Sequence, residues 1–147
     1  MEANEQASCW LQTGQQAMEI EAQAITLAAQ RLDDSFARAV ELILSHRGKL
    51  VVTGLGKSGH VARKIVATLC STGTPAVFLH AADASHGDLG IYAPGDPTLM
   101  ISKSGATSEL LRLIPSLREL RSQRIGILGN PASPLAAAGK ESRTEFR

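Results

Sequence analysis

Aromatic side chains are scarce in this sequence, and neither sign of charge dominates it. Phe, Trp and Tyr make up 3% of the 147 residues, and 15 Lys and Arg residues nearly balance 14 Asp and Glu residues. Proteins that bind single-stranded nucleic acid usually offer aromatic stacking platforms, and a strong positive field is needed to attract nucleic acid or an anionic membrane. We therefore expect neither nucleic acid nor a membrane among the partners of this chain.

Long apolar runs and cysteine pairs are also missing. No stretch approaches the roughly 18 consecutive apolar residues that a membrane-spanning helix needs. The first ten residues lack the basic region and apolar run of a signal peptide. Cys9 and Cys70 are far apart and form no CxxC pair, which is typical of reduced thiols in a cytoplasmic protein. The sequence thus predicts a cytoplasmic location.

Two helices are expected at the amino end, within residues 1–48. Apolar residues recur at helical spacing over residues 4–31, with Gln and Glu on the other face. A second helix is predicted to begin with Asp33 or Asp34 as its cap and to end at Gly48. Both helices would precede the main domain.

From residue 49 onward, short apolar runs rich in β-branched residues alternate with helical patterns. The predicted strands are residues 49–53, 76–80, 98–102 and 124–128, and the predicted helices between them are residues 60–72 and 107–121. Such alternation predicts a doubly wound α/β fold with a parallel sheet. A flavodoxin-like strand order of 2-1-3-4 would make the first and third strands neighbours.

The segment after the fourth strand fits this pattern less well. Residues 133–138 have the beginning of a helical pattern, whereas residues 140–147 are polar and lack strand character. We expect a C-terminally incomplete domain over residues 49–139, followed by a tail that is disordered or unrelated to the domain.

The loop after the first strand reads Gly54-Leu-Gly-Lys-Ser-Gly59 and leads into a helix. Glycines permit positive φ and close backbone approach to a ligand, and a helix start favours phosphate. The residues alone leave three interpretations open. The run matches the GxGxxG dinucleotide fingerprint, which also needs an acid after the second strand, for which Asp83 is a candidate. Another phosphate ligand, with Lys57 as its cation, and a glycine turn needed only for packing are the alternatives.

The loop after the third strand, residues 102–109, reads SKSGATSE. Its hydroxyl-bearing residues are Ser102, Ser104, Thr107 and Ser108. Hydroxyls and free amides together form a neutral anion cradle, and Gly105 permits a turn into a helix. Ordinary capping explains Glu109 and one or two hydroxyls, but not all of them. In the predicted strand order both loops open at the carboxyl ends of neighbouring strands, where ligands bind, so the pattern favours a ligand site.

These two loops carry a family resemblance. The second loop matches SxSGxTxE, the phosphosugar-binding signature of sugar isomerase (SIS) domains. Residues 54–90, with their GKSGH, STGTP and SHGDLG segments, are similar to the arabinose 5-phosphate isomerases of 3-deoxy-manno-octulosonate (Kdo) synthesis, which serves lipopolysaccharide or capsule formation. The resemblance covers roughly residues 15–135 and implies reversible interconversion of D-arabinose 5-phosphate and D-ribulose 5-phosphate. It implies a phosphorylated sugar as partner, a homo-oligomer for the full-length family, and no organic cofactor.

The resemblance also assigns roles to residues. Lys57 and Glu109 match catalytic positions, with Lys57 polarising a sugar oxygen or holding an enediolate and Glu109 shuttling protons. The implied substrate-binding and phosphate-binding residues are Gly56, Ser58, Ser102, Ser104, Gly105 and Thr107. His86 matches a histidine implicated in binding inhibitory metal, with a structural hydrogen bond as the alternative. His60 and Asp88 are assigned to the lining of the pocket.

Two departures from the family pattern affect these expectations. The family's second loop usually reads SNSGESSE, so Lys103 replaces Asn and Ala106 replaces Glu. The resemblance also places two further catalytic residues, a Glu and a His, beyond Arg147, together with a fifth strand and paired regulatory CBS domains. A non-catalytic phosphosugar-binding module is therefore the alternative to an isomerase.

Overall fold

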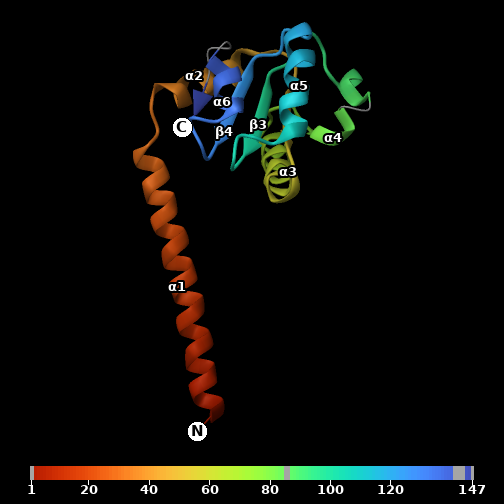
Figure 1. The fold of residues 1–147 in the computed structure, drawn as a ribbon. Coiled ribbons are helices and arrows are strands. Elements are labelled where there is room, and N and C mark those ends of the chain that lie inside the picture. The colour runs from red at the N-terminus through yellow and green to blue at the C-terminus, as the bar shows by residue number, and fades with distance from the viewer. Residues whose placement is uncertain (1, 85–86, 141–144, 147) are drawn as a thin grey trace. The chain divides into compact units, whose positions relative to one another are not determined.

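The structure is a computed structural model that describes residues 2–84, 87–140 and 145–146 (Figure 1). The chain forms two compact units, Met1–Leu32 and Asp33–Arg147. The first unit is a single helix, α1 (Glu2–Gln30), which confirms the helix predicted over residues 4–31. Its large apolar side chains at Trp10, Leu11, Met18, Ile20, Ile25 and Leu27 are exposed. None of the helices in the described ranges is both long enough and apolar enough to span a membrane.

The second unit alternates helices and strands. Its elements are α2 (Asp34–Ser45), β1 (Leu50–Gly54), α3 (Gly56–Ser71), β2 (Ala76–His80), α4 (Ala81–Ala84), η1 (Asp88–Ile91), β3 (Thr98–Ser102), α5 (Ser108–Glu119), β4 (Arg124–Leu128), α6 (Pro134–Lys140) and β5 (Glu145–Phe146). Asp33 is the N-cap of α2, as predicted, and its carboxylate accepts the Ser35 N–H at 2.8 Å. The short helix α4 and the 3-10 turn η1 lie between the second and third predicted strands, where no helix was predicted.

The strands form one parallel sheet in the order β2-β1-β3-β4-β5. The predicted order 2-1-3-4 is therefore confirmed. No strand was predicted in residues 140–147, but the structure has one there. Strand β5 pairs with Gly126 and Ile127 of β4. Pairing at a sheet edge uses backbone groups, so a polar segment can form it without the apolar alternation that marks a buried strand. The rest of the tail, residues 141–144 and 147, lies outside the described residues.

The side chains of each strand alternate between the two faces of the sheet. Both faces are apolar, and helices cover both of them. On one face, Val51 and Met100 pack with Leu110 and Leu117 of α5 in a cluster that α4 and α6 extend. On the other face, Val52 belongs to a cluster with residues of α2 and α3. Each large aliphatic side chain buried in these clusters contributes about 1.5–3 kcal/mol. Two apolar layers thus hold the sheet in place on both sides.

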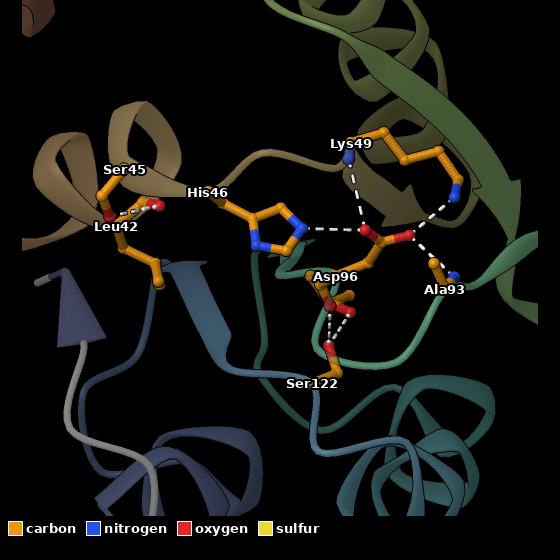
Figure 2. A network of polar contacts seen from close by, with 8 residues as sticks. Leu42, Ser45, His46, Lys49, Ala93, Asp96 and Ser122 are labelled. Atoms are coloured by element: carbon orange, nitrogen blue, oxygen red, sulfur yellow. Dashed lines mark hydrogen bonds and ion pairs between the residues drawn. The ribbon is translucent and has the colours of Figure 1, made fainter.

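A buried carboxylate organises the amino end of the sheet (Figure 2). Asp96 precedes β3 and is 1% exposed. Its Oδ2 accepts from Lys49 Nζ at 2.6 Å and from the Ala93 N–H at 2.8 Å, while its Oδ1 lies 2.9 Å from His46 Nε2. The Ser122 hydroxyl donates to the Asp96 carbonyl at 2.6 Å. Because Lys49 and Ser122 precede β1 and β4, this network joins the starts of three strands.

The pKa values of two buried groups are shifted, Asp96 within this network and Tyr92 near it. Burial raises the pKa of Asp96, but the hydrogen bonds from Lys49, Ala93 and His46 outweigh burial and hold that pKa well below its usual range. Burial raises the pKa of Tyr92 to about 12, although its hydroxyl bonds the Thr98 hydroxyl at 2.9 Å. At neutral pH Asp96 is therefore ionised and Tyr92 is neutral.

Candidate functional site

A pocket of about 460 Å³ lies at the carboxyl ends of β1 and β3. Its lining residues are Leu55, Ser58, Ile101, Ser102, Lys103, Ser104 and Thr107. Gly54 pairs with Ile101 in the sheet, so the loops that follow β1 and β3 start side by side. The pocket therefore joins the two loops that the sequence singled out.

The first loop is shaped by close packing of helix α3 on strand β1. A Cβ atom on Gly59 would lie 2.9 Å from the Gly54 carbonyl oxygen, so a side chain there would push the helix off the strand. Gly56 has a φ of +51°, which favours glycine. Packing thus accounts for part of the glycine pattern. The N-cap residue, Leu55, makes no side-chain hydrogen bond to the helix, which leaves the first N–H groups of α3 for another partner.

The second loop is closed by its own hydroxyls. The Oγ of Ser102, which is buried, accepts the Gly105 N–H at 3.0 Å and lies 2.9 Å from Thr107 Oγ1. Ser104 is exposed, and its Oγ accepts the Ala106 N–H at 3.2 Å. A serine that accepts in this way still has its hydroxyl proton to donate. Ser102 thus holds the loop in shape, while Ser104 presents a donor at the pocket.

The segment after β4 braces this loop from behind. The Gly129 N–H donates to the Ser102 carbonyl at 3.2 Å, and the Leu135 N–H donates to the Gly105 carbonyl at 3.0 Å. Gly105 has a φ of +63°, and a Cβ atom there would collide with the Ser133 hydroxyl. A side chain at this position would therefore be strained and would require Ser133 to move.

The two predicted catalytic residues lie at helix starts beside the pocket. Lys57 is exposed in the first turn of α3, and Glu109 is in the first turn of α5. Neither is among the described residues that line the pocket. The Glu109 carboxylate accepts from the Ser108 hydroxyl at 2.8 Å. That bond, helped by a backbone N–H and by the charges of Arg112 and His80, lowers the pKa of Glu109, so its carboxylate is ionised and able to accept a proton.

Two further predicted residues, Asp88 and His60, do not line this pocket. Asp88 lines a second cavity of about 440 Å³ whose walls also include Arg63, Phe78, His80 and Asp83. His60 is exposed on α3 and is not among the described residues lining either cavity. The predicted metal residue, His86, lies outside the described residues. Within the described ranges no three His, Cys, Asp or Glu residues gather in a way that suits a metal ion.

Sequence reasoning missed two features of this region. Lys103 was noted only as a departure from a pattern, yet it lines the pocket. His80 was not considered, although it ends β2 beside Gly54. Its Nδ1 is buried without a hydrogen bond and lies 3.9 Å from Asp83 Oδ1. The carboxyl ends of parallel strands are where ligands usually bind, and that rule was the signal available for both residues.

Comparison with known proteins assigns the domain to a family. A family profile described as the SIS domain matches residues 43–142. The chain belongs to the SIS domain family. Among curated proteins, this SIS domain chain is 44% identical over 131 residues to the arabinose 5-phosphate isomerase KdsD of Pseudomonas aeruginosa, covering 89% of the chain. It is 47% identical over 130 residues to the arabinose 5-phosphate isomerase GutQ of Escherichia coli K12, covering 88% of the chain.

A solved structure shares the same SIS fold. The structure of c3406 from Escherichia coli CFT073, in complex with arabinose 5-phosphate, matches with a TM-score of 0.81 and 37% identity, covering 88% of this chain and 68% of that chain. The present chain spans only 40% of the length of the two curated relatives. It is thus homologous to the SIS domain part of arabinose 5-phosphate isomerases.

Proposed function

We propose that this chain binds D-arabinose 5-phosphate in the pocket between β1 and β3 and belongs to an isomerase that converts it reversibly to D-ribulose 5-phosphate. The observation that carries the proposal is the convergence of Ser58, Ser102, Ser104 and Thr107 on one pocket at the carboxyl edge of the sheet. Hydroxyl donors and the starts of two helices suit a phosphate monoester. Homology to arabinose 5-phosphate isomerases supports the choice of sugar.

Isomerisation needs a base near the carbon that is deprotonated. In the proposed reaction, Glu109 accepts the proton from carbon two, and the electron pair forms an enediolate between carbons one and two. Lys57 stabilises the negative charge that develops on the carbonyl oxygen. Return of the proton to carbon one, with transfer of the remaining hydroxyl proton between the two oxygens, gives the ketose with no change in overall composition. The lowered pKa of Glu109 keeps its carboxylate in the ionised form that can accept a proton, and it also makes that carboxylate a weaker base than an ordinary Glu.

A non-catalytic phosphosugar-binding module is the second candidate. The observation that favours it is the position of Lys57 and Glu109, which are not among the described residues that line the pocket. Isomerisation of arabinose 5-phosphate by the chain, abolished in a Glu109→Gln variant, would exclude this candidate. Binding without measurable turnover in the parent chain would favour it.

Binding can be tested by titrating the chain with arabinose 5-phosphate while recording two-dimensional amide NMR spectra. We expect the shifts to concentrate on residues 54–59 and 102–109. Ser104→Ala should weaken binding by about tenfold, because a hydrogen bond to a charged group is worth about 1.5–3 kcal/mol. Ser71→Ala, an exposed hydroxyl at the end of α3, is the matched control and should bind as the parent does. Equal affinity of the Ser104→Ala variant and the parent would show that the pocket is assigned wrongly.

A further inference from the structure

Lys103 is the one charged residue among the described residues that line the pocket between β1 and β3. The other lining residues are Leu55, Ser58, Ile101, Ser102, Ser104 and Thr107, all of them uncharged. We propose that Lys103 is the cation that neutralises the ligand's phosphate, and that it gives the pocket a preference for the phosphate dianion. This inference rests on the proposed function, since it concerns the same pocket.

The backbone at Lys103 is held in a fixed position. A Cβ atom on Gly129 would lie 2.5 Å from the Lys103 carbonyl oxygen, so the two segments are in contact and residue 129 has no space for a side chain. On one side of Lys103, the Ser102 carbonyl accepts the Gly129 N–H. On the other side, Ser104 is followed by the braced Gly105. The lysine side chain therefore extends from a rigid point at the wall of the pocket.

The charge balance of the pocket calls for such a cation. A phosphate monoester carries a charge of about −1.5 to −2 near neutral pH. Hydroxyls supply hydrogen bonds but no net charge, and the start of helix α5 supplies roughly +0.5. Glu109 in the first turn of α5 adds a negative charge that opposes the ligand. One lysine at the pocket wall offsets this repulsion and part of the charge of the phosphate.

Lys57 fills this role less well than Lys103. Both are exposed lysines on the two loops, but Lys57 lies in the first turn of α3 and is not among the described lining residues. The two lysines therefore have different roles: Lys103 binds the phosphate, and Lys57 remains available for the sugar oxygens. The ligand class is a compact phosphate monoester whose phosphate, and not its sugar, contacts the second loop.

The test compares Lys103→Gln, Lys103→Arg and the control Lys64→Gln, an exposed lysine on α3 that donates to the Thr68 hydroxyl. Dissociation constants for arabinose 5-phosphate and for inorganic phosphate are measured by NMR titration at low and high salt and at pH 5 and pH 7. We expect Lys103→Gln to weaken the binding of both ligands by about tenfold at low salt and to reduce the salt dependence of the dissociation constants. The parent should gain affinity from pH 5 to pH 7, where the phosphate becomes a dianion, and this gain should be smaller in Lys103→Gln. Lys103→Arg and Lys64→Gln should retain affinity.

Three outcomes would overturn the inference. If Lys103→Gln binds as tightly as the parent, with the same salt dependence, while Ser104→Ala binds weakly, the phosphosugar pocket stands but Lys103 does not contact the phosphate. If Lys103→Arg keeps a native amide spectrum but loses affinity as Lys103→Gln does, the lysine acts through shape and not through charge. If the folded parent binds neither ligand, this inference and the proposed function both fail.

Discussion

The two ends of strands β1 and β3 differ in how completely their polar groups are bonded. At the amino end, the Asp96 carboxylate is buried and is bonded by Lys49, Ala93 and His46 from the segments that precede the strands. At the carboxyl end, Ser104 is exposed and its hydroxyl retains a proton to donate. The same strands thus have a fully bonded polar network at the amino end, here called the saturated end, and a hydroxyl free to donate at the carboxyl end, here called the open end. The carboxylate at the amino end thus has partners within the protein, whereas the exposed serine hydroxyl at the carboxyl end can still donate to a ligand.

The largest loss of stability is expected when the Asp96 network at the saturated end is disrupted. Asp96→Asn removes the charge that Lys49 and His46 face, and the free energy of unfolding should fall by about 3 kcal/mol, because the removal of one partner leaves the others unpaired. Urea denaturation monitored by circular dichroism measures this loss. Asp83→Asn is the matched control at an exposed site, and it should change stability by less than about 0.5 kcal/mol. Equal losses in the two variants would contradict the comparison.

Acid should lower the stability of the protein through the Asp96 network. The pKa of Asp96 is lowered in the folded protein, so its contribution is fully present above the unfolded value of about 3.9 and is lost as the pH falls toward the folded value. We expect the free energy of unfolding of the parent to fall more steeply below about pH 5 than that of Asp96→Asn. Parallel pH profiles for the two proteins would show that Asp96 is not the group responsible.

The next effect concerns the rigidity of the open end. Gly105→Ala places a side chain at a positive φ and against Ser133, which should cost about 2 kcal/mol and displace the second loop. Affinity for arabinose 5-phosphate should fall with it, while the amides near Asp96 keep their chemical shifts. Gly90→Ala is the control, because a Cβ atom there meets nothing within 4 Å. An unchanged affinity in Gly105→Ala would show that the loop adapts.

The smallest effect is expected at Tyr92. Tyr92→Phe removes one hydrogen bond to Thr98, which keeps its bond to Ser122 at 2.7 Å, so the loss should be about 1 kcal/mol near neutral pH. The pKa of Tyr92 is raised to about 12, and its contribution is therefore present below the unfolded value of about 10 and is lost as the pH rises through 12. Denaturation at pH 8 and pH 11 should show the parent losing stability that the variant does not lose.

Local sequence patterns predicted the strands well and the helix starts less well. The strands at residues 76–80, 98–102 and 124–128 are confirmed, because buried β-branched runs between turn residues are a strong local signal. Helix α3 was expected from His60 but begins at Gly56. Its first turn includes two of the loop glycines, which are poor helix formers, and the packing of Gly59 on Gly54 decides the boundary instead.

Long-range contacts explain what the sequence did not reveal. Asp96 lies 50 residues from His46 and 47 residues from Lys49, and no local pattern connects such positions. The two loops were predicted to share a site because the strand order brings β1 beside β3, and the pocket contains residues of both. The positions of Lys57 and Glu109 outside the pocket wall could not be read from the sequence, since they depend on the directions in which α3 and α5 leave the sheet.

The central position of β3 has a consequence for the motions of the protein. Every residue of β3 is buried, and parallel strands flank it on both sides. Its amide hydrogens should therefore exchange with solvent only when the whole sheet opens, more slowly than those of the outer strands. The second loop begins at the last residue of this strand, Ser102. Any local opening that admits a ligand should therefore be confined to the loop and stop at Ser102. A bound ligand should slow the hydrogen exchange of the loop amides and leave the exchange rates of the β3 amides unchanged.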